Sequence, residues 1–305
     1  MRVGVNLINF GPSANPDSLR RWARLTETLG YHLLMTSDHV ATTRDVAEKY
    51  PAPFYEPLTT LGWLAAVTET VEIGTTVAIL PYRSPLETAR AFANIDQLSG
   101  GRCILGIGVG WARQEFEALN LPFEKRGAMT DEYLEAIRLF WTRDTASYDG
   151  EFVRFKDVQT APRPLRQPHP PVWVGGSSGP ALRRTVRLAE AWHPIRFTLP
   201  WFRDTGIPRL RAVADKDGKP MPALCPRIRL RLLDAPAPEE DRICGTGSLD
   251  QVRGDMAALE ELGCTHVLLD TFRDDIEASR NLEEQWRMIA VMAEQVLDLA
   301  NETTR

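Results

Sequence analysis

The chain has 305 residues, of which 43% are hydrophobic and 25% are charged, and its formal net charge is −5. This composition is that of a globular protein, and a mildly acidic chain is not expected to bind nucleic acid. No apolar run approaches the ~20 residues that cross a bilayer. The apolar run at residues 3–8 is shorter than the core of a signal peptide, about 7 residues or more. We therefore expect a cytoplasmic protein with no membrane partner.

The four cysteines lie far apart and form no CxxC pair, and no cluster of His, Asp and Glu has the spacing of metal ligands. Neither a disulfide framework nor a metal site is therefore expected. Only five of the 36 basic residues are Lys. Surface physics does not demand such an excess of Arg, whereas the codon usage of a GC-rich genome would produce it.

Short β-branched runs alternate with amphipathic segments through the first half of the chain. Strands are predicted over residues 3–8, 32–36, 71–80 and 103–109. The helices between and after them are predicted over residues 16–29, 57–70, 85–98 and 130–141. Asn15 followed by Pro16 is a helix start signal, and Ser84 with Glu87 forms the pattern of a capping box.

The same alternation continues to the last helix. Strands are predicted over residues 171–174, 191–197, 227–232 and 266–270, and helices after the run at 175–180 and over 248–262 and 281–296. Asp149-Gly150 between apolar residues predicts a hairpin over 147–155. The Pro-rich segments 162–171 and 194–226 interrupt this alternation of strands and helices. The second follows a strand, so we expect it to form a lid or a substrate wall.

About eight such units fit either a closed (β/α)8 barrel or an open doubly wound sheet, both of the α/β class. The (β/α)8 TIM barrel is favoured because the pattern runs to the last helix without a domain-scale break. We therefore expect one domain over residues 1–305, with insertions near 143–171 and 197–226.

In a barrel, function lies where the strands end. Asp38 and His39 follow the second predicted strand, and His39 is a candidate proton donor or acceptor near neutral pH. On position alone, a plain loop cap explains the pair equally well. His193 lies near the end of a later strand, where it would wall a pocket. Gly74, inside the third predicted strand, indicates either a bulge or a plain strand.

Two glycine-rich segments also follow strands. Gly106, Gly108 and Gly110 expose backbone to a ligand, but their GxGxG spacing after the fourth strand is not a dinucleotide-binding fingerprint. Residues 175–180 open a helix with two glycines and two serines. Free N–H groups, hydroxyls and the helix dipole make this segment the best candidate for phosphate binding, although a simple helix cap needs only one serine.

Taken together, these segments resemble the luciferase-like monooxygenase superfamily of flavin and deazaflavin oxidoreductases. The resemblance covers essentially the whole chain and runs through residues 37–39, 56–111, 173–178 and 245–252. It is strongest to the branch that depends on coenzyme F420, an 8-hydroxy-5-deazaflavin common in actinobacteria, and the Arg excess agrees with an actinobacterial source. The family fold is the (β/α)8 barrel.

The resemblance also implies roles for individual residues. Asp38 and His39 match a pair beside the cofactor, with His39 at the reacting centre. The segment Thr75-Thr76-Val77 matches a bulge that backs the cofactor ring, with a non-prolyl cis peptide between Thr76 and Val77. The remaining matches are a loop lining the ring, formed by Gly108, Val109 and Gly110, and a phosphate-binding loop, formed by Gly175, Gly176, Ser177 and Ser178.

The sequence departs from the family pattern at Trp111. In the sugar-phosphate dehydrogenases of the superfamily an acidic residue follows the glycines, so glucose 6-phosphate is not the expected substrate here. We expect Trp111 and Trp192 to face a more apolar substrate pocket.

The sequence thus indicates an F420-dependent enzyme, a homodimer by resemblance, that transfers a hydride between the deazaflavin C5 and a small organic substrate. Two alternatives remain open: an FMN-dependent monooxygenase on the same barrel, and a non-catalytic flavin-binding barrel.

Overall fold

The computed structural model describes residues 1–273 and 280–305. Its main sheet is parallel throughout and follows the order β10-β9-β8-β5-β3-β2-β1-β14-β11. The strands of this path are β1 (Arg2–Leu7), β2 (Leu33–Thr36), β3 (Glu72–Thr75), β5 (Cys103–Gly108), β8 (Val172–Gly175), β9 (Ala191–His193), β10 (Ala223–Leu224), β11 (Arg227–Arg229) and β14 (His266–Asp270).

The two ends of this path belong to one stretch of chain, and this closes the sheet. β10 pairs with β9, and β11, three residues further along, pairs with β14. Bridges between Ile195 and Arg227 and between Leu224 and Cys264 join the same stretch to both neighbours. Eight strand positions therefore form a closed cycle, and the predicted (β/α)8 barrel is confirmed.

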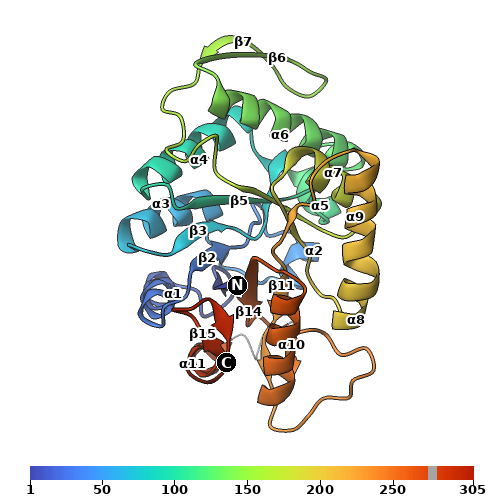
Figure 1. The fold of residues 1–305 in the computed structure, drawn as a ribbon. Coiled ribbons are helices and arrows are strands. Elements are labelled where there is room, and N and C mark those ends of the chain that lie inside the picture. The colour runs from blue at the N-terminus through green and yellow to red at the C-terminus, as the bar shows by residue number, and fades with distance from the viewer. Residues whose placement is uncertain (274–279) are drawn as a thin grey trace.

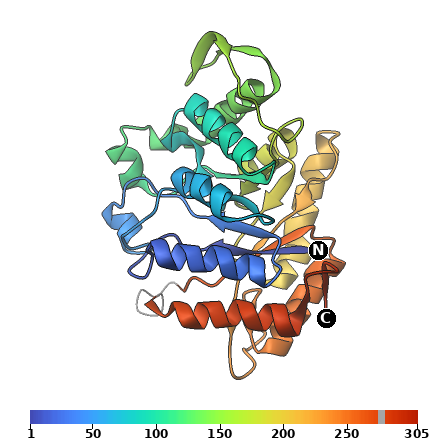
Figure 2. The same cartoon turned by 90° about the vertical axis from the view of Figure 1, so that its left-hand side faces the viewer.

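Helices cover the outside of the barrel (Figure 1). The longer ones are α1 (Pro16–Thr28), α3 (Pro57–Val67), α4 (Pro85–Leu98), α6 (Arg126–Thr142), α7 (Gly179–Leu188), α9 (Ile207–Lys216), α10 (Leu249–Glu261) and α11 (Leu282–Val291). The short helices are α2 (Arg44–Ala47), α5 (Arg113–Ala118) and α8 (Leu199–Trp201). The first and last helices, α1 and α11, lie side by side (Figure 2), where Trp22 and Trp286 meet edge to face at 6.0 Å.

Helix boundaries follow local signals in most places. The Asn15 side chain accepts hydrogen bonds from the N–H groups of Asp17 and Ser18, and Ser248 with Gln251 forms a capping box. The capping box predicted at Ser84 is wrong, because its side chain makes no cap hydrogen bond. Helix α4 still begins at Pro85, whose fixed φ suits a first helical position.

The predicted hairpin and the second Pro-rich segment, which both interrupt the alternation of strands and helices, differ in outcome. The hairpin is confirmed as β6 (Thr145–Asp149) and β7 (Arg154–Gln159), which project beyond α6 (Figure 1). The lid or substrate wall expected over 194–226 is confirmed only at its start: Ile195 lines the pocket, whereas residues 197–226 do not. That longer part holds α8, a π-helical turn and α9, which packs against α7 as a regular outer helix. Smaller pairs are formed by β12 (Arg231–Leu232) with β13 (Thr246–Gly247), and by β15 (Leu297–Asp298) with β16 (Thr303–Thr304).

The barrel interior is layered. A cluster separate from the outer core fills its middle with Leu33, Met35, Ile104, Trp173, Ala191, Cys225 and Leu268. Side chains two positions further along a strand share the same face. Beyond Trp173, Ala191, Cys225 and Leu268 these positions are Gly175, His193, Arg227 and Asp270, so the interior becomes small and polar toward the carboxyl ends.

No helix among residues 1–273 and 280–305 is long and apolar enough to cross a membrane.

Candidate active site

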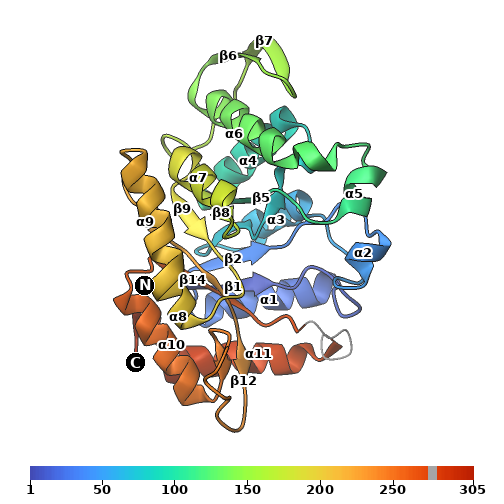
Figure 3. The ribbon, with the colours of Figure 1, turned by 90° about the vertical axis from the view of Figure 1, so that its right-hand side faces the viewer.

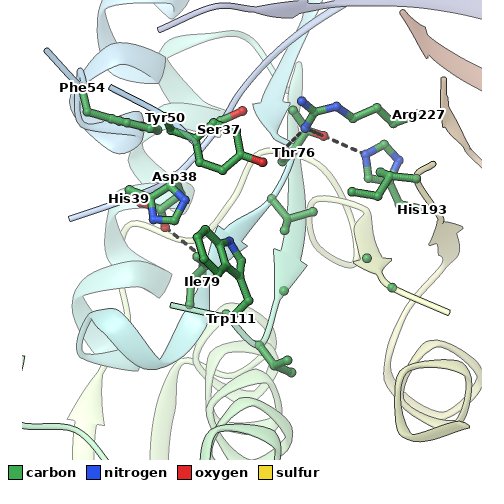
Figure 4. Close-up of a pocket in the computed structure, with 17 residues that line it drawn as sticks. Ser37, Asp38, His39, Tyr50, Phe54, Thr76, Ile79, Trp111, His193 and Arg227 are labelled. Atoms are coloured by element: carbon green, nitrogen blue, oxygen red, sulfur yellow. Dashed lines mark hydrogen bonds between the residues drawn. The ribbon is translucent and has the colours of Figure 1, made fainter. Parts of the chain in front are cut away.

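A pocket of about 290 Å3 opens at the carboxyl ends of the strands. The loops after β2, β3, β5, β8 and β9 surround it, and Figure 3 shows α2 and α5 beyond the same end of the barrel. The residues that line it are Ser37, Asp38, His39, Tyr50, Phe54, Thr76, Val77, Ile79, Gly108, Val109, Gly110, Trp111, Gly175, Gly176, His193, Ile195 and Arg227. In Figure 4, His39 and the aromatic side chains lie on one side, opposite His193 and Arg227.

The predicted strand over 71–80 breaks at Thr76 and Val77. The peptide bond between them is cis, as the resemblance implies, and the strand resumes as β4 (Ala78–Ile79). A Cβ added to Gly108 would lie 2.6 Å from Val77 Cγ2, and one added to Gly175 would lie 3.3 Å from Val77 Cγ1. The glycines therefore leave the space in which the Val77 side chain lies. Together these residues form what we call the glycine wall: Val77, Gly108 and Gly175.

His39 is held by a carboxylate that sequence reasoning missed. Its Nδ1 lies 2.7 Å from Oε2 of Glu115, which also accepts hydrogen bonds from the Tyr82 hydroxyl and from the N–H groups of Val40 and Ala41. Burial alone would raise the pKa of Glu115, but the hydrogen bonds from His39, Ala41 and Tyr82 outweigh it and lower that pKa. The carboxylate is thus ionised, so Nδ1 of His39 carries a proton and Nε2 is the nitrogen left for the pocket.

Asp38 is a structural ion-pair partner as well as a pocket residue. Its two oxygens accept hydrogen bonds from Arg83 at 2.7 and 2.8 Å, and Oδ2 also accepts one from the N–H of Ile79. The Asp38 side chain is fully buried, and Arg83 makes a further ion pair with Glu56. The carboxylate therefore fixes the loop after β2 to the strand that follows the cis peptide.

A polar network crosses the other side of the pocket. His193 Nδ1 contacts the carbonyl oxygen of Cys225, which can only accept, so Nδ1 carries the proton. Nε2 of His193 is then an acceptor for the Thr76 hydroxyl at 2.9 Å. Arg227 donates to the Thr76 carbonyl at 2.7 Å and to Asp270 at 2.7 Å. The four side chains fix one another and leave no unpaired charge between them.

The neutral state of His193 leads to a prediction about stability and pH. Burial, with Arg227 and His266 nearby, lowers the pKa of His193 to about 4. Its ordinary pKa is about 6.5, so between the two values only the unfolded chain binds the proton. The free energy of unfolding is therefore expected to fall by about 3 kcal/mol as pH drops from about 6.5 to 4. Urea unfolding of His193→Asn, which keeps the hydrogen bond to Cys225, should show a shallower fall. Parallel pH profiles for the two proteins would contradict this assignment.

The predicted phosphate loop joins β8 to α7. Gly175 and Gly176 line the pocket, whereas Ser177 and Ser178 do not. The Ser178 hydroxyl caps α7 by accepting from the Ala181 N–H at 3.3 Å. Helix N-termini leave N–H groups without partners inside the helix, so the loop is a chemically suitable anion site.

Two predicted site residues lie elsewhere. Trp192 does not face the pocket, and this expectation is wrong: its ring is fully buried against Phe202, and its Nε1 donates to the Gly176 carbonyl. Thr75 is buried within β3, where its hydroxyl donates to the Gly106 carbonyl. His193, by contrast, does wall the pocket, and Trp111 lines it with 39% of its surface exposed.

Sequence reasoning also missed several residues that line or support the pocket, namely Tyr50, Phe54, Arg83, Glu115, Ile195 and Arg227. Tyr50 and Phe54 lie between α2 and α3, in the long connection that follows β2, and only their place in that connection could have suggested them. No group of His, Cys, Asp and Glu among the described residues could hold a metal ion.

Comparison with known proteins agrees with this architecture. An uncharacterised protein of Mycobacterium tuberculosis is 31% identical over 246 residues, covering 73% of this chain and 86% of that protein. The FMNH(2)-dependent dimethylsulfone monooxygenase of Pseudomonas putida is 34% identical over 193 residues, covering 62% of this chain and 51% of that protein.

The fold is shared with the coenzyme F420-dependent tetrahydromethanopterin reductase of Methanopyrus kandleri. The TM-score is 0.77 at 15% sequence identity, over 96% of this chain and 97% of that one. The model of the family described as luciferase-like monooxygenase matches residues 1–241. The chain therefore belongs to the luciferase-like monooxygenase family.

Proposed function

We propose that the protein is an F420-dependent oxidoreductase that transfers a hydride between C5 of the deazaflavin and a small organic substrate. The observation that carries this proposal is the glycine wall, which lines the same pocket as His39. An added Cβ would meet Val77 at Gly108 and Phe116, 2.8 Å away, at Gly110. At both glycines the space that a side chain would need is already filled by the protein, so a planar ring would meet the Val77 side chain and backbone there.

The residues present fit such a cofactor. Val77 would back the ring, Gly108 to Gly110 would line its edge, and the loop from Gly175 to Ser178 would receive its phosphate. When bound, the deazaflavin supplies or accepts the hydride, and the protein supplies binding, orientation and exclusion of water. His39, held by Glu115, is the group placed to exchange a proton with the substrate through Nε2.

FMN is the second candidate cofactor. The similarity to the FMNH(2)-dependent dimethylsulfone monooxygenase supports it, because that relative shares 34% of the aligned residues. The similarity to the F420-dependent reductase supports the first candidate through the fold alone. The same wall and phosphate loop suit both ring systems.

Titration of the purified protein with F420 and with FMN, followed by cofactor fluorescence, distinguishes the candidates. We expect F420 to bind more tightly than FMN. Binding of FMN without binding of F420, together with oxygen-dependent turnover, would replace the first proposal with the second. Binding of a cofactor without hydride transfer to any substrate would favour a non-catalytic barrel.

The glycine wall gives a second test. Gly108→Ala places a methyl group against Val77, so we expect F420 affinity to fall about tenfold, in line with the usual cost of overpacking. Gly62→Ala is the matched control, since an added Cβ there meets nothing within 4 Å and its affinity should equal that of the unaltered protein. Equal F420 affinity in both variants would remove the wall from the cofactor site.

A further inference from the structure

The ionisable side chains that line the pocket are neutralised within the protein. The Asp38 carboxylate is paired with Arg83, and His39 is hydrogen-bonded to Glu115. Arg227 is paired with Asp270 at 2.7 Å, and burial keeps His193 uncharged at neutral pH. A charged group entering this pocket would lose its hydration without gaining a free opposite charge, which is costly.

One side of the pocket is an aromatic wall of Tyr50, Phe54 and Trp111, which surrounds His39 (Figure 4). The ring centroids of Tyr50 and Phe54 each lie 5.4 Å from that of His39, and Trp111 meets His39 edge to face at 5.8 Å. Lys49 lies 4.1 Å from the centre of the Trp111 ring, a cation–π contact that occupies one face of the indole. The wall therefore offers apolar ring surface with T-shaped contacts suited to another flat ring.

Two polar atoms on this side have no partner in residues 1–273 and 280–305. They are Nε2 of His39, whose other nitrogen is bonded to Glu115, and the hydroxyl of Tyr50. Both belong to residues that line the pocket. An apolar ligand with a single oxygen would satisfy this arrangement, whereas a ligand with several polar groups would leave some of them unbonded.

We infer that the substrate is an uncharged aromatic or cyclic ketone, or the secondary alcohol formed from it, with its ring against the aromatic wall and its oxygen at His39. This inference rests on the proposed hydride-transfer function. In the reductive direction the carbonyl carbon accepts a hydride, with two electrons, from the reduced deazaflavin. The carbonyl π bond breaks, and the oxygen accepts a proton from Nε2 of the doubly protonated His39 ring, whose positive charge faces the Glu115 carboxylate; solvent then returns a proton to Nε2. In the oxidative direction the same bonds form and break in reverse.

The test compares acetophenone with 4-acetylbenzoate, which is the same ketone bearing a carboxylate. Calorimetric titration of the F420-loaded protein at pH 7 is expected to show acetophenone binding at least about tenfold more tightly. Equal or tighter binding of 4-acetylbenzoate would overturn the inference and would indicate that Lys49 recruits an anion. Failure of acetophenone to bind the loaded protein would also overturn it.

Matched variants locate the binding. Trp111→Ala is expected to weaken acetophenone binding about tenfold, while Trp111→Phe keeps most of it, because each ring contact contributes about 1 kcal/mol. Trp63→Phe, a half-buried Trp of α3 outside the pocket, should leave the affinity for acetophenone unchanged. An unchanged affinity in Trp111→Ala would remove the wall from the substrate site.

The same titrations on the protein without cofactor and with FMN separate this inference from the proposed function. The preference for the uncharged ketone is a property of the protein side chains, so it should persist in all three states. If F420 fails to bind while the preference persists, the proposed function falls and the substrate class stands. If F420 binds and the preference is absent, the substrate class falls and the proposed function stands.

Discussion

Replacement of Asp38 by alanine is expected to lower the free energy of unfolding by about 3 to 5 kcal/mol, the usual cost of removing one partner of a buried ion pair. The Asp38 side chain is fully buried, and Arg83 keeps only 15% of its side chain exposed. Without the carboxylate, the Arg83 guanidinium and the Ile79 N–H lose an acceptor in a site that water reaches poorly. Urea unfolding followed by circular dichroism measures the difference.

Two further variants make this result specific. Asp38→Asn keeps an acceptor for Ile79 and should destabilise the protein less than Asp38→Ala does. Glu56→Gln removes the negative charge of the second partner of Arg83. The Glu56 side chain is 40% exposed, so we expect a change of about 1 kcal/mol or less. If the free energy of unfolding of Asp38→Ala lies within 1 kcal/mol of that of the unaltered protein, Glu56 and solvent are sufficient partners for Arg83.

The second large effect is expected on catalysis. His39→Ala should lower the turnover of acetophenone with reduced F420 about 100-fold or more, because positioned proton transfer contributes about 10²–10⁴-fold to a rate. The Kd for F420 should change little, because the glycine wall and the loop at Gly175 are untouched. Stopped-flow oxidation of the reduced cofactor measures the rate, and fluorescence titration measures the affinity.

Glu115→Gln tests what the carboxylate does for His39 without removing the His39 ring. It retains His39 and can still accept a hydrogen bond from Nδ1, but it removes the negative charge that faces the ring. We expect an intermediate rate and a displaced pH profile, which a merely structural role would not produce. Unchanged turnover and cofactor affinity in His39→Ala would exclude the proton-exchange role.

The fold follows from local patterns to a large extent. Alternating β-branched runs and amphipathic helices, with start signals such as Asn15 and Ser248, predict the barrel and most element boundaries. The break in the third strand is different, since nothing in the residue types at Thr76 and Val77 specifies a cis bond, and only the family resemblance implies it. The segment 197–226 was harder still, because its prolines resemble those of a loop although it forms an outer helix.

The site shows the same division between local and distant contacts. His39 and the glycines lie at strand ends and were accessible to sequence reasoning. Glu115 reaches His39 from 76 positions along the chain, and Arg227 reaches Thr76 from 151 positions, so only the closed barrel brings them together. Trp192 and His193 are adjacent in a strand and point to opposite faces, so the two could not both enter the pocket.

The pairing of β1 with β14 has a consequence for how the chain is made. These strands close the barrel although Gly4 and Leu268 are paired across nearly the whole sequence. During synthesis the edge of β1 is exposed, with its backbone N–H and C=O groups unpaired, until the ribosome has released residues 266–270. Such late contacts are slow to form because a long loop must close first. Nascent chains that stall before β14 should therefore be the species that aggregates or recruits chaperones.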